Sequence, residues 1–224
     1  MTENGTIRSF VRRDSRITRA QRLALDRNLD NYALPACADA VDLGSAFGRR
    51  APCTLEIGSG DGECIVDLAK LHSDENFVAV EVYRPGLGRL LNLIEAQKLT
   101  NIRVCNEDII EVLARITGEV FDQVLIFFPD PWPKKRHNKR RLLQQKFFDV
   151  LAPRVHRHGR LFIATDSENY AQSIKETIED SAKWANLGGP WNSSPRVNFR
   201  PVTKFERKAR VAESHVYDFI FSRV

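Results

Sequence analysis

The sequence predicts an α/β protein with a doubly wound, mainly parallel β-sheet. Short apolar stretches alternate with amphipathic ones along most of the chain. This alternation is typical of parallel strands joined by right-handed helical crossovers, with helices on both faces of the sheet. A glycine-rich turn, GSGDG, follows the first apolar stretch. The chain has 224 residues, 42% hydrophobic and 28% charged, which suits one domain with a sizeable core.

The first element is expected to be a helix through residues 18–29, TRAQRLALDRNL, which Thr18 or a neighbour can cap. Residues 31–52 contain Pro, Gly and small side chains and indicate a connector. We therefore divide the chain into an N-terminal extension and connector, residues 1–52, and a main domain, residues 53–224.

The main domain is expected to alternate strands and helices. Apolar stretches predict strands at residues 54–57, 77–82, 102–106, 120–128, 159–164 and 216–224. Helical spacing between them predicts helices at residues 63–71, 84–98, 108–116, 140–151 and 168–180. In a doubly wound sheet, ligands bind beyond the carboxyl ends of the strands. Functional residues are therefore expected just after each strand.

The first strand ends in LEIGSGDG, residues 55–62. The dinucleotide fingerprint would need glycine at position 63, where Glu63 stands. Glycines at alternate positions, such as Gly58 and Gly60, let a small ligand lie against the backbone. Asp61 and Glu63 would repel a pyrophosphate but tolerate a cationic amine or sulfonium.

Acids follow the next two strands. Glu81 closes the second strand, where a carboxylate can bind both ribose hydroxyls of an adenosine. Asp108 follows the third strand and could accept a hydrogen bond from an adenine amino group. S-adenosylmethionine has an amine, a ribose and an adenine, which Glu56 or the glycine turn, Glu81 and Asp108 could bind in that order. We therefore predict S-adenosylmethionine as the cofactor.

The fourth strand leads into FFPDPWPKKRHNKRR, residues 127–141. Two prolines flank Asp130 and fix where its carboxylate points. That carboxylate could accept the N–H donors of a guanine edge. Guanine N7 carries no proton, so its methylation needs alignment with the sulfonium carbon rather than a general base. The product base is cationic, and a nearby carboxylate stabilises it. Trp132 is interpreted as a packing residue rather than a base-stacking one.

Basic residues are concentrated in four segments, residues 8–22, 134–141, 154–160 and 200–210, and the net charge is +5. Six Lys or Arg side chains fall within residues 134–141 and could contact the phosphates that flank a target base. Several basic clusters on one compact domain favour a nucleic-acid partner.

Several other classes of protein are disfavoured. No apolar run is long enough to span a bilayer, and the N-terminus lacks the apolar centre of a secretory signal, so a cytoplasmic protein is expected. The four cysteines form no CxxC pair and have no histidines at zinc spacing, so we expect no metal. The sequence leaves open whether the protein is a monomer or a homodimer.

These motifs together resemble those of the bacterial tRNA (guanine-N7-)-methyltransferases, a family of class I S-adenosylmethionine-dependent enzymes. The similar segments are IRSFVRRDSRITRAQ, LEIGSGDG, VEVYRPG, FFPDPWPKKRHNKRR, ATD and RPVTKFE, and the resemblance covers nearly the whole chain. It implies a Rossmann-like, seven-stranded sheet with an N-terminal helical extension. It also implies methyl transfer to N7 of a guanosine in the tRNA variable loop, position 46 in tRNA numbering.

The resemblance implies a role for individual residues. The implied cofactor contacts are Glu56, Gly58, Gly60, Glu81, Asp108 and Asp130, and Asp130 is also the implied catalytic acid. The implied substrate-binding residues are Lys134, Asp166, Thr203, Lys204, Phe205 and Glu206. The implied RNA contacts are Arg136, His137, Asn138, Lys139, Arg140 and Arg141.

The chain departs from the family pattern after TKFE. The family usually has an Arg-Gly pair and a later Gly-His pair, where this chain has Lys208-Ala209 and Glu213-Ser214. Since alanine does not readily adopt the positive φ of glycine, we expect the loop after Glu206 to take another path.

Two alternative functions are also considered. Exocyclic-amine methyltransferases of DNA or RNA favour an Asn/Asp-Pro-Pro-aromatic turn after the fourth strand, and here Trp132 directly follows a single proline. A non-catalytic RNA-binding module with a vestigial cofactor fold is the second alternative. The presence of Glu56, Glu81, Asp108 and Asp130 disfavours it.

Overall fold

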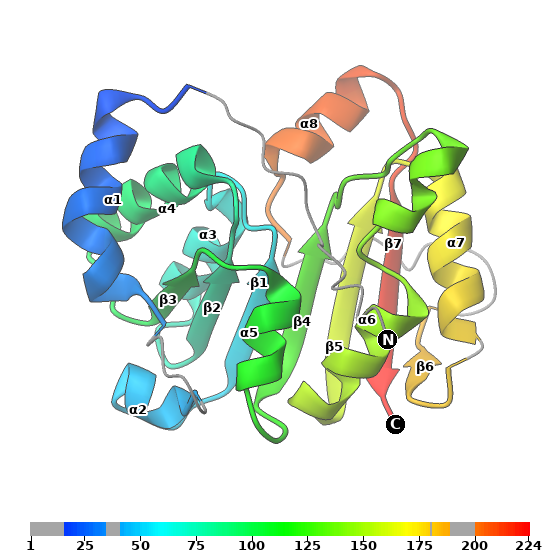
Figure 1. The fold of residues 1–224 in the computed structure, drawn as a ribbon, viewed down its shortest axis with the longest axis horizontal. Coiled ribbons are helices and arrows are strands. Elements are labelled where there is room, and N and C mark those ends of the chain that lie inside the picture. The colour runs from blue at the N-terminus through cyan, green and yellow to red at the C-terminus, as the bar shows by residue number, and fades with distance from the viewer. Residues whose placement is uncertain (1–15, 35–40, 180, 189–199) are drawn as a thin grey trace, which may run out of the picture.

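The computed structural model describes residues 16–34, 41–179, 181–188 and 200–224, without the side chains of Phe205 and Arg210. Within these residues, one seven-stranded sheet has the order β3-β2-β1-β4-β5-β7-β6 (Figure 1). Strands β1 to β5 are parallel, and β7 runs antiparallel to its neighbours β5 and β6. The predicted doubly wound, mainly parallel, seven-stranded sheet is therefore confirmed. The strands are β1 (Cys53–Ile57), β2 (Asn76–Val80), β3 (Ile102–Cys105), β4 (Phe121–Phe127), β5 (Val155–Thr165), β6 (Trp184–Asn186) and β7 (Tyr217–Arg223).

Helices cover both faces of the sheet and produce two hydrophobic clusters. One cluster includes buried side chains of α5, α6 and α7, and the other includes those of α1, α3 and α4. The α-helices in the described ranges are α1 (Arg19–Tyr32), α2 (Leu43–Phe47), α3 (Glu63–Leu71), α4 (Arg84–Gln97), α5 (Ile109–Arg115), α6 (Gln145–Leu151), α7 (Glu168–Glu179) and α8 (Lys204–Val211). None of these helices has the length and apolar character needed to cross a membrane.

The first helix packs against the main sheet domain. Thr18 caps α1 and forms a reciprocal capping box with Gln21, which confirms the predicted cap. The buried side chains of Ala24 and Leu25 join the cluster formed by α3 and α4. The side chain of Asn28 also donates a 2.8 Å hydrogen bond to Glu95 on α4. The N-terminal extension thus shares a core with the sheet that follows it.

Some elements differ from those predicted. The helix expected at residues 140–151 begins only at Gln145, and a 3₁₀ helix, η1 (Lys135–Arg140), precedes it. The segment after Glu206 continues as α8 to Val211, with Ala209 buried in the helix, and the first positive φ follows at Glu213. Helices α2 and α8 and strand β6 were not predicted, because each is short and lacks a long apolar pattern.

The parallel strands place their carboxyl ends on one edge of the sheet. In Figure 1, α8 lies beyond the arrowhead of β4 at this edge. The turns after β1, β2, β3, β4 and β5 therefore open on the same side of the molecule, where ligands of doubly wound sheets bind.

Candidate active site at the carboxyl edge of the sheet

Hydrogen bonds join Glu81 to the glycine turn. The carboxylate of Glu81 accepts from the backbone N–H of Gly60 at 2.6 Å and from that of Tyr83 at 2.7 Å. Gly58 and Gly60 have φ values of +76° and +56°, which glycine adopts without strain. A Cβ on either glycine would meet no described atom within 4 Å. The predicted cofactor residues of β1 and β2 thus lie together, with open space above the turn.

Glu56 contributes a buried carboxyl group beside this turn. Its side chain belongs to the sheet face that α3 covers, and the residue is 4% exposed. Burial raises the pKa of Glu56 to about 7, although hydrogen bonds from Cys64 and Ser59 oppose the rise. Its Oε2 atom has no hydrogen-bond partner among the described atoms. A buried carboxyl oxygen without a partner is costly, so a cationic ligand group nearby would be stabilised.

Asp108 lies at the neighbouring strand end. It caps α5 by accepting a 2.9 Å hydrogen bond from the backbone N–H of Ile110. The side chain of Asn106 donates to the backbone oxygen of Glu81 at 2.6 Å. Since β2 and β3 are paired, Glu81 and Asp108 follow adjacent strands.

The acids that end the glycine turn form ion pairs. Asp61 pairs with Arg89 at 3.3 Å and with Lys204 at 3.5 Å. Glu63 pairs with Arg207 at 3.0 Å and also accepts from the backbone N–H of Lys204 at 3.1 Å. We expected Asp61 and Glu63 to repel a pyrophosphate and to tolerate a cationic ligand; in the structure, protein cations already pair with both acids. Helix α8 is therefore joined to the glycine turn.

Asp130 lies on a strained turn after β4. Phe128 and Trp132 have φ values of +53° and +45°, a region that non-glycine residues rarely adopt. The backbone N–H of Phe128 donates to the carbonyl of Ala164 on β5 at 2.7 Å. The negative charge of Asp130 adds to the burial that raises the pKa of Tyr170, so Asp130 lies within electrostatic reach of α7. Asp130 is exposed at the carboxyl edge of the sheet.

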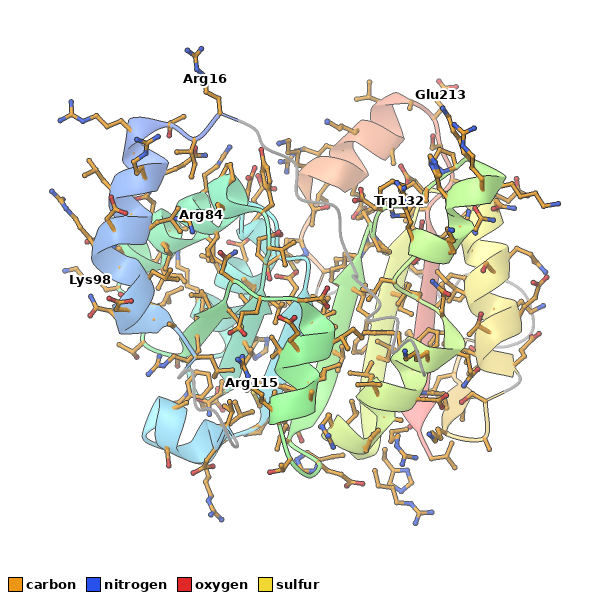
Figure 2. The ribbon with its side chains drawn as sticks, viewed as in Figure 1. Arg16, Arg84, Lys98, Arg115, Trp132 and Glu213 are labelled. Atoms are coloured by element: carbon orange, nitrogen blue, oxygen red, sulfur yellow. The ribbon has the colours of Figure 1, made fainter. Side chains whose placement is uncertain are left out.

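The cationic segment after this turn is largely open to solvent. Its exposed side chains are Lys134, Lys135, Arg136, Lys139 and Arg140. Trp132 lies 5.9 Å, centroid to centroid, from the ring of His137, and the guanidinium of Arg140 lies 5.1 Å from the centre of the indole. Figure 2 shows Trp132 near the upper ends of the strands. Both neighbours contact its ring, so Trp132 packs within this segment.

Arg141 differs from the rest of the segment because its side chain is buried, with 3% of the residue exposed. Its guanidinium donates to the carbonyl of Pro131 at 2.9 Å and to the side chain of Asn169 at 2.6 Å. It also lies 4.8 Å from the centre of the Tyr170 ring. An RNA contact needs an accessible guanidinium, so the contact predicted for Arg141 is replaced by a contact within the protein. Asn138 is half-buried, and its Oδ1 atom has no described partner.

The predicted substrate residues fall into two groups. Lys134 and Asp166 are exposed, after β4 and β5 respectively. Thr203 accepts a 3.3 Å hydrogen bond from the backbone N–H of Glu206, and Lys204 is exposed beside the glycine turn. Glu206 is buried, with 2% of the residue exposed, so its carboxylate faces the protein interior. The side chain of Phe205 lies outside the described residues.

Arg200 and Asp218 were not identified from the sequence. Arg200 is fully buried, and its guanidinium contacts Asp218 at 2.8 and 3.0 Å and Glu206 at 3.0 Å. One signal was available: Asp218 interrupts the apolar strand VYDFIF. A buried carboxylate in such a strand calls for a cationic partner.

Comparisons with known proteins agree with this arrangement. A family model described as "Putative methyltransferase" matches residues 50–219. The tRNA (guanine-N(7)-)-methyltransferase of Nitrosomonas europaea is 42% identical over 224 residues, covering 100% of this chain and 99% of that protein.

Two solved structures share the fold. The 16S rRNA methyltransferase KamB has a TM-score of 0.59 and 10% identity, covering 85% of this chain and 97% of its own. A Streptococcus mutans protein solved in complex with SAH has a TM-score of 0.52 and 11% identity, covering 93% of this chain and 100% of its own. These two structures support the fold alone, whereas the full-length relative identifies the family. The chain belongs to the tRNA (guanine-N7-)-methyltransferase family.

Proposed function

We propose that this protein transfers a methyl group from S-adenosylmethionine to N7 of a guanosine in the tRNA variable loop, position 46 in tRNA numbering. The observation that carries the proposal is the position of Asp130. It is exposed on the turn after β4, and β4 pairs directly with β1, whose glycine turn binds Glu81. This strand order supports a position for the acid near the open space where the cofactor would lie.

The residues around the glycine turn fit the proposed cofactor. S-adenosylmethionine supplies an electrophilic methyl group on a sulfonium. Glu81 would hold the ribose hydroxyls, since each of its oxygens accepts one backbone N–H and retains a second lone pair. Asp108 would accept from the adenine amino group, and Glu56 would stabilise the ligand amine through its buried oxygen. Gly58 and Gly60 leave room for the ligand against the backbone.

Asp130 would act on the base. Guanine N7 has a lone pair and no proton, so the protein must align the base rather than deprotonate it. The Asp130 carboxylate would accept the N–H donors of the guanine edge and stabilise the positive charge that methylation creates. A rigid turn suits this role, because prolines flank Asp130 and the backbone on both sides is fixed in an unusual conformation.

Exposed cations around the same edge would bind the tRNA backbone. They include Lys134, Lys135, Arg136, Lys139 and Arg140 after β4, Arg16 just before α1, and Arg19 and Arg22 at exposed positions of α1. Figure 2 shows Arg16 at the upper edge of the molecule and Trp132 lower down, near the upper ends of the strands. Phosphate contacts of this kind position a nucleic acid without reading its sequence. A tRNA substrate agrees with the cytoplasmic location expected from the sequence.

The test is to incubate the protein with unmodified tRNA and labelled S-adenosylmethionine, then map the methylated nucleotide. We expect one labelled guanosine, in the variable loop, carrying the methyl group on N7. A transcript with adenosine at that position should remain unlabelled. A methyl group on an exocyclic nitrogen would favour the exocyclic-amine alternative. Absence of binding heat with the cofactor in calorimetry would favour the RNA-binding module.

A further inference from the structure

The turn that carries Asp130 needs support from its surroundings. Phe128 and Trp132, two residues before and two residues after Asp130, both have positive φ. Such conformations persist in non-glycine residues only where neighbouring structure holds them. Two buried arginines contact this turn, one on each side of Asp130.

Arg200 supports the side that enters the turn. Phe127, Ala164 and Asp218 are paired across β4, β5 and β7, so their side chains share one face of the sheet. The guanidinium of Arg200 binds Asp218 on this face and lies 5.2 Å from the ring centre of Phe127 and 5.6 Å from that of Phe128. Its planar group contacts two carboxylates through separate nitrogens while lying near two aromatic rings, a geometry that a compact ammonium does not reproduce.

Arg200 also connects the turn to α8. Its second terminal nitrogen lies 3.0 Å from a carboxylate oxygen of Glu206, and both side chains are buried. Helix α8 in turn binds the glycine turn through Lys204 and Arg207. One guanidinium therefore joins the Asp130 turn, the last strand of the sheet and the helix that contacts the cofactor turn.

Arg141 supports the side that leaves the turn. Its guanidinium donates to the carbonyl of Pro131, the residue after Asp130, and to Asn169 on α7. The Tyr170 ring covers it, and the Tyr170 hydroxyl accepts from the backbone N–H of Leu143 at 3.0 Å. These contacts hold the cationic segment against α7.

We propose that Arg200 and Arg141 are positioning residues that hold the Asp130 turn in its reactive conformation, and that Glu206 acts through Arg200 rather than on the substrate. The expected change in kcat rests on the proposed function, because it requires that the protein methylates tRNA. Small displacements of a group that aligns reactants can lower a rate by about 100-fold. The loss should therefore appear in kcat, while the cofactor residues on β1 and β2 keep their geometry.

The first test uses Trp132 as a reporter of the turn. The chain has three tryptophans, and replacing Trp184 and Trp191 by Phe leaves Trp132 as the only indole. The ring nitrogen of Trp184 has no hydrogen-bond partner in the described structure, so Phe removes no such bond there. Arg200→Lys and Arg141→Lys should each increase the quenching of Trp132 fluorescence by acrylamide. Unchanged quenching in both variants would overturn the proposal.

The second test compares kinetics with binding. Each lysine variant should lower kcat by about 100-fold, while calorimetry gives an unchanged Kd for S-adenosylmethionine. The salt dependence of tRNA binding should also stay unchanged, because neither arginine contacts phosphate. If Arg141 instead contacted an RNA phosphate, the lysine in Arg141→Lys could make the same contact. The kcat of that variant would then stay near the wild-type value, which would contradict the proposal. Glu206→Gln should lower kcat without weakening tRNA binding; weaker tRNA binding would make Glu206 a substrate contact.

Stability needs a matched control. Ile178→Ala removes buried apolar atoms from α7 and should lower the melting temperature without changing Trp132 quenching or kcat. If the lysine variants lose only as much activity as this control, the arginines are merely structural. Should Arg200→Lys fail to fold, Asp218→Asn keeps the side-chain shape, and the same changes in quenching and kcat are expected. Quenching needs no substrate, so it decides the positioning role even if the proposed methylation fails.

Discussion

The backbone N–H of Gly60 donates a 2.6 Å hydrogen bond to a carboxylate oxygen of Glu81. This bond ties the acid after β2 to the glycine turn after β1, although 21 residues separate them. The shape of the turn and the position of the acid are therefore coupled, so changing one is expected to disturb the other.

Glu81→Ala should weaken binding of S-adenosylmethionine by about 10- to 100-fold, the effect of losing hydrogen bonds to a charged group. The substitution also leaves the N–H groups of Gly60 and Tyr83 without their acceptor. Calorimetry gives the Kd directly. Glu75→Gln, at the amino end of β2, is the control and should bind like the wild type. Equal affinities for Glu81→Ala and the wild type would show that Glu81 does not bind the ribose.

The raised pKa of Glu56 predicts that the stability of the protein depends on pH. Its pKa rises from an ordinary value of 4.5 to about 7 through burial, so between these pH values the folded protein binds more protons than the unfolded chain. The free energy of unfolding therefore falls as pH rises across this window, by about 3 kcal/mol in total for this group. Glu56→Gln does not titrate and should escape this loss.

Thermal melts at pH 4.5 and pH 8 check this prediction. The melting temperature of Glu56→Gln minus that of the wild type should be larger at pH 8 than at pH 4.5, by roughly 6–12 °C. Comparing the two proteins isolates Glu56, because Glu81, whose pKa is also raised by burial, is present in both. A constant difference would show that Glu56 ionises with an ordinary pKa.

Asp130→Asn should lower the single-turnover methylation rate by about 100-fold, because the amide does not stabilise the cationic product base as a carboxylate does. The variant keeps the size of the side chain, so the turn should remain folded. Asp149→Asn, an exposed acid on α6, is the control and should react at the wild-type rate. A rate for Asp130→Asn within a few-fold of the wild type would exclude the charge-stabilising role.

Lys135, Arg136 and Lys139 are exposed on the segment after β4. Replacing all three by Gln should weaken tRNA binding and reduce the slope of log K against log salt concentration by about 3, one unit for each lost phosphate contact. Filter binding between low and moderate salt measures the slope. Lys70→Gln and Lys98→Gln together remove two exposed charges outside this segment and should leave the slope nearly unchanged. A slope that the triple substitution does not alter would place the tRNA elsewhere.

Much of the fold could be predicted because its signals are local. The apolar strands and the acids that follow them lie within short segments, and the topology of a parallel sheet brings these strand ends together. Glu81, Asp108 and Asp130 could thus be identified as a group without any knowledge of their contacts. Capping of α1 by Thr18 is equally local, since the box spans four residues.

Contacts between distant segments could not be predicted in the same way. Arg141 stands in a run of cations that looks exposed throughout, and its burial depends on Asn169 and Tyr170 from α7. Glu206 stands in a polar segment, and its burial depends on Arg200 and the adjoining strand. In both cases the charge is neutralised or enclosed by partners whose positions follow only from tertiary packing.

The place of β7 in the sheet has a consequence for synthesis. This strand follows all the other elements along the chain yet is inserted between β5 and β6, where it brings Asp218 to Arg200. A ribosome therefore makes the glycine turn and Asp130 long before it makes Asp218, which binds Arg200. The nascent protein is expected to stay inactive toward tRNA until β7 emerges from the exit tunnel and completes the sheet.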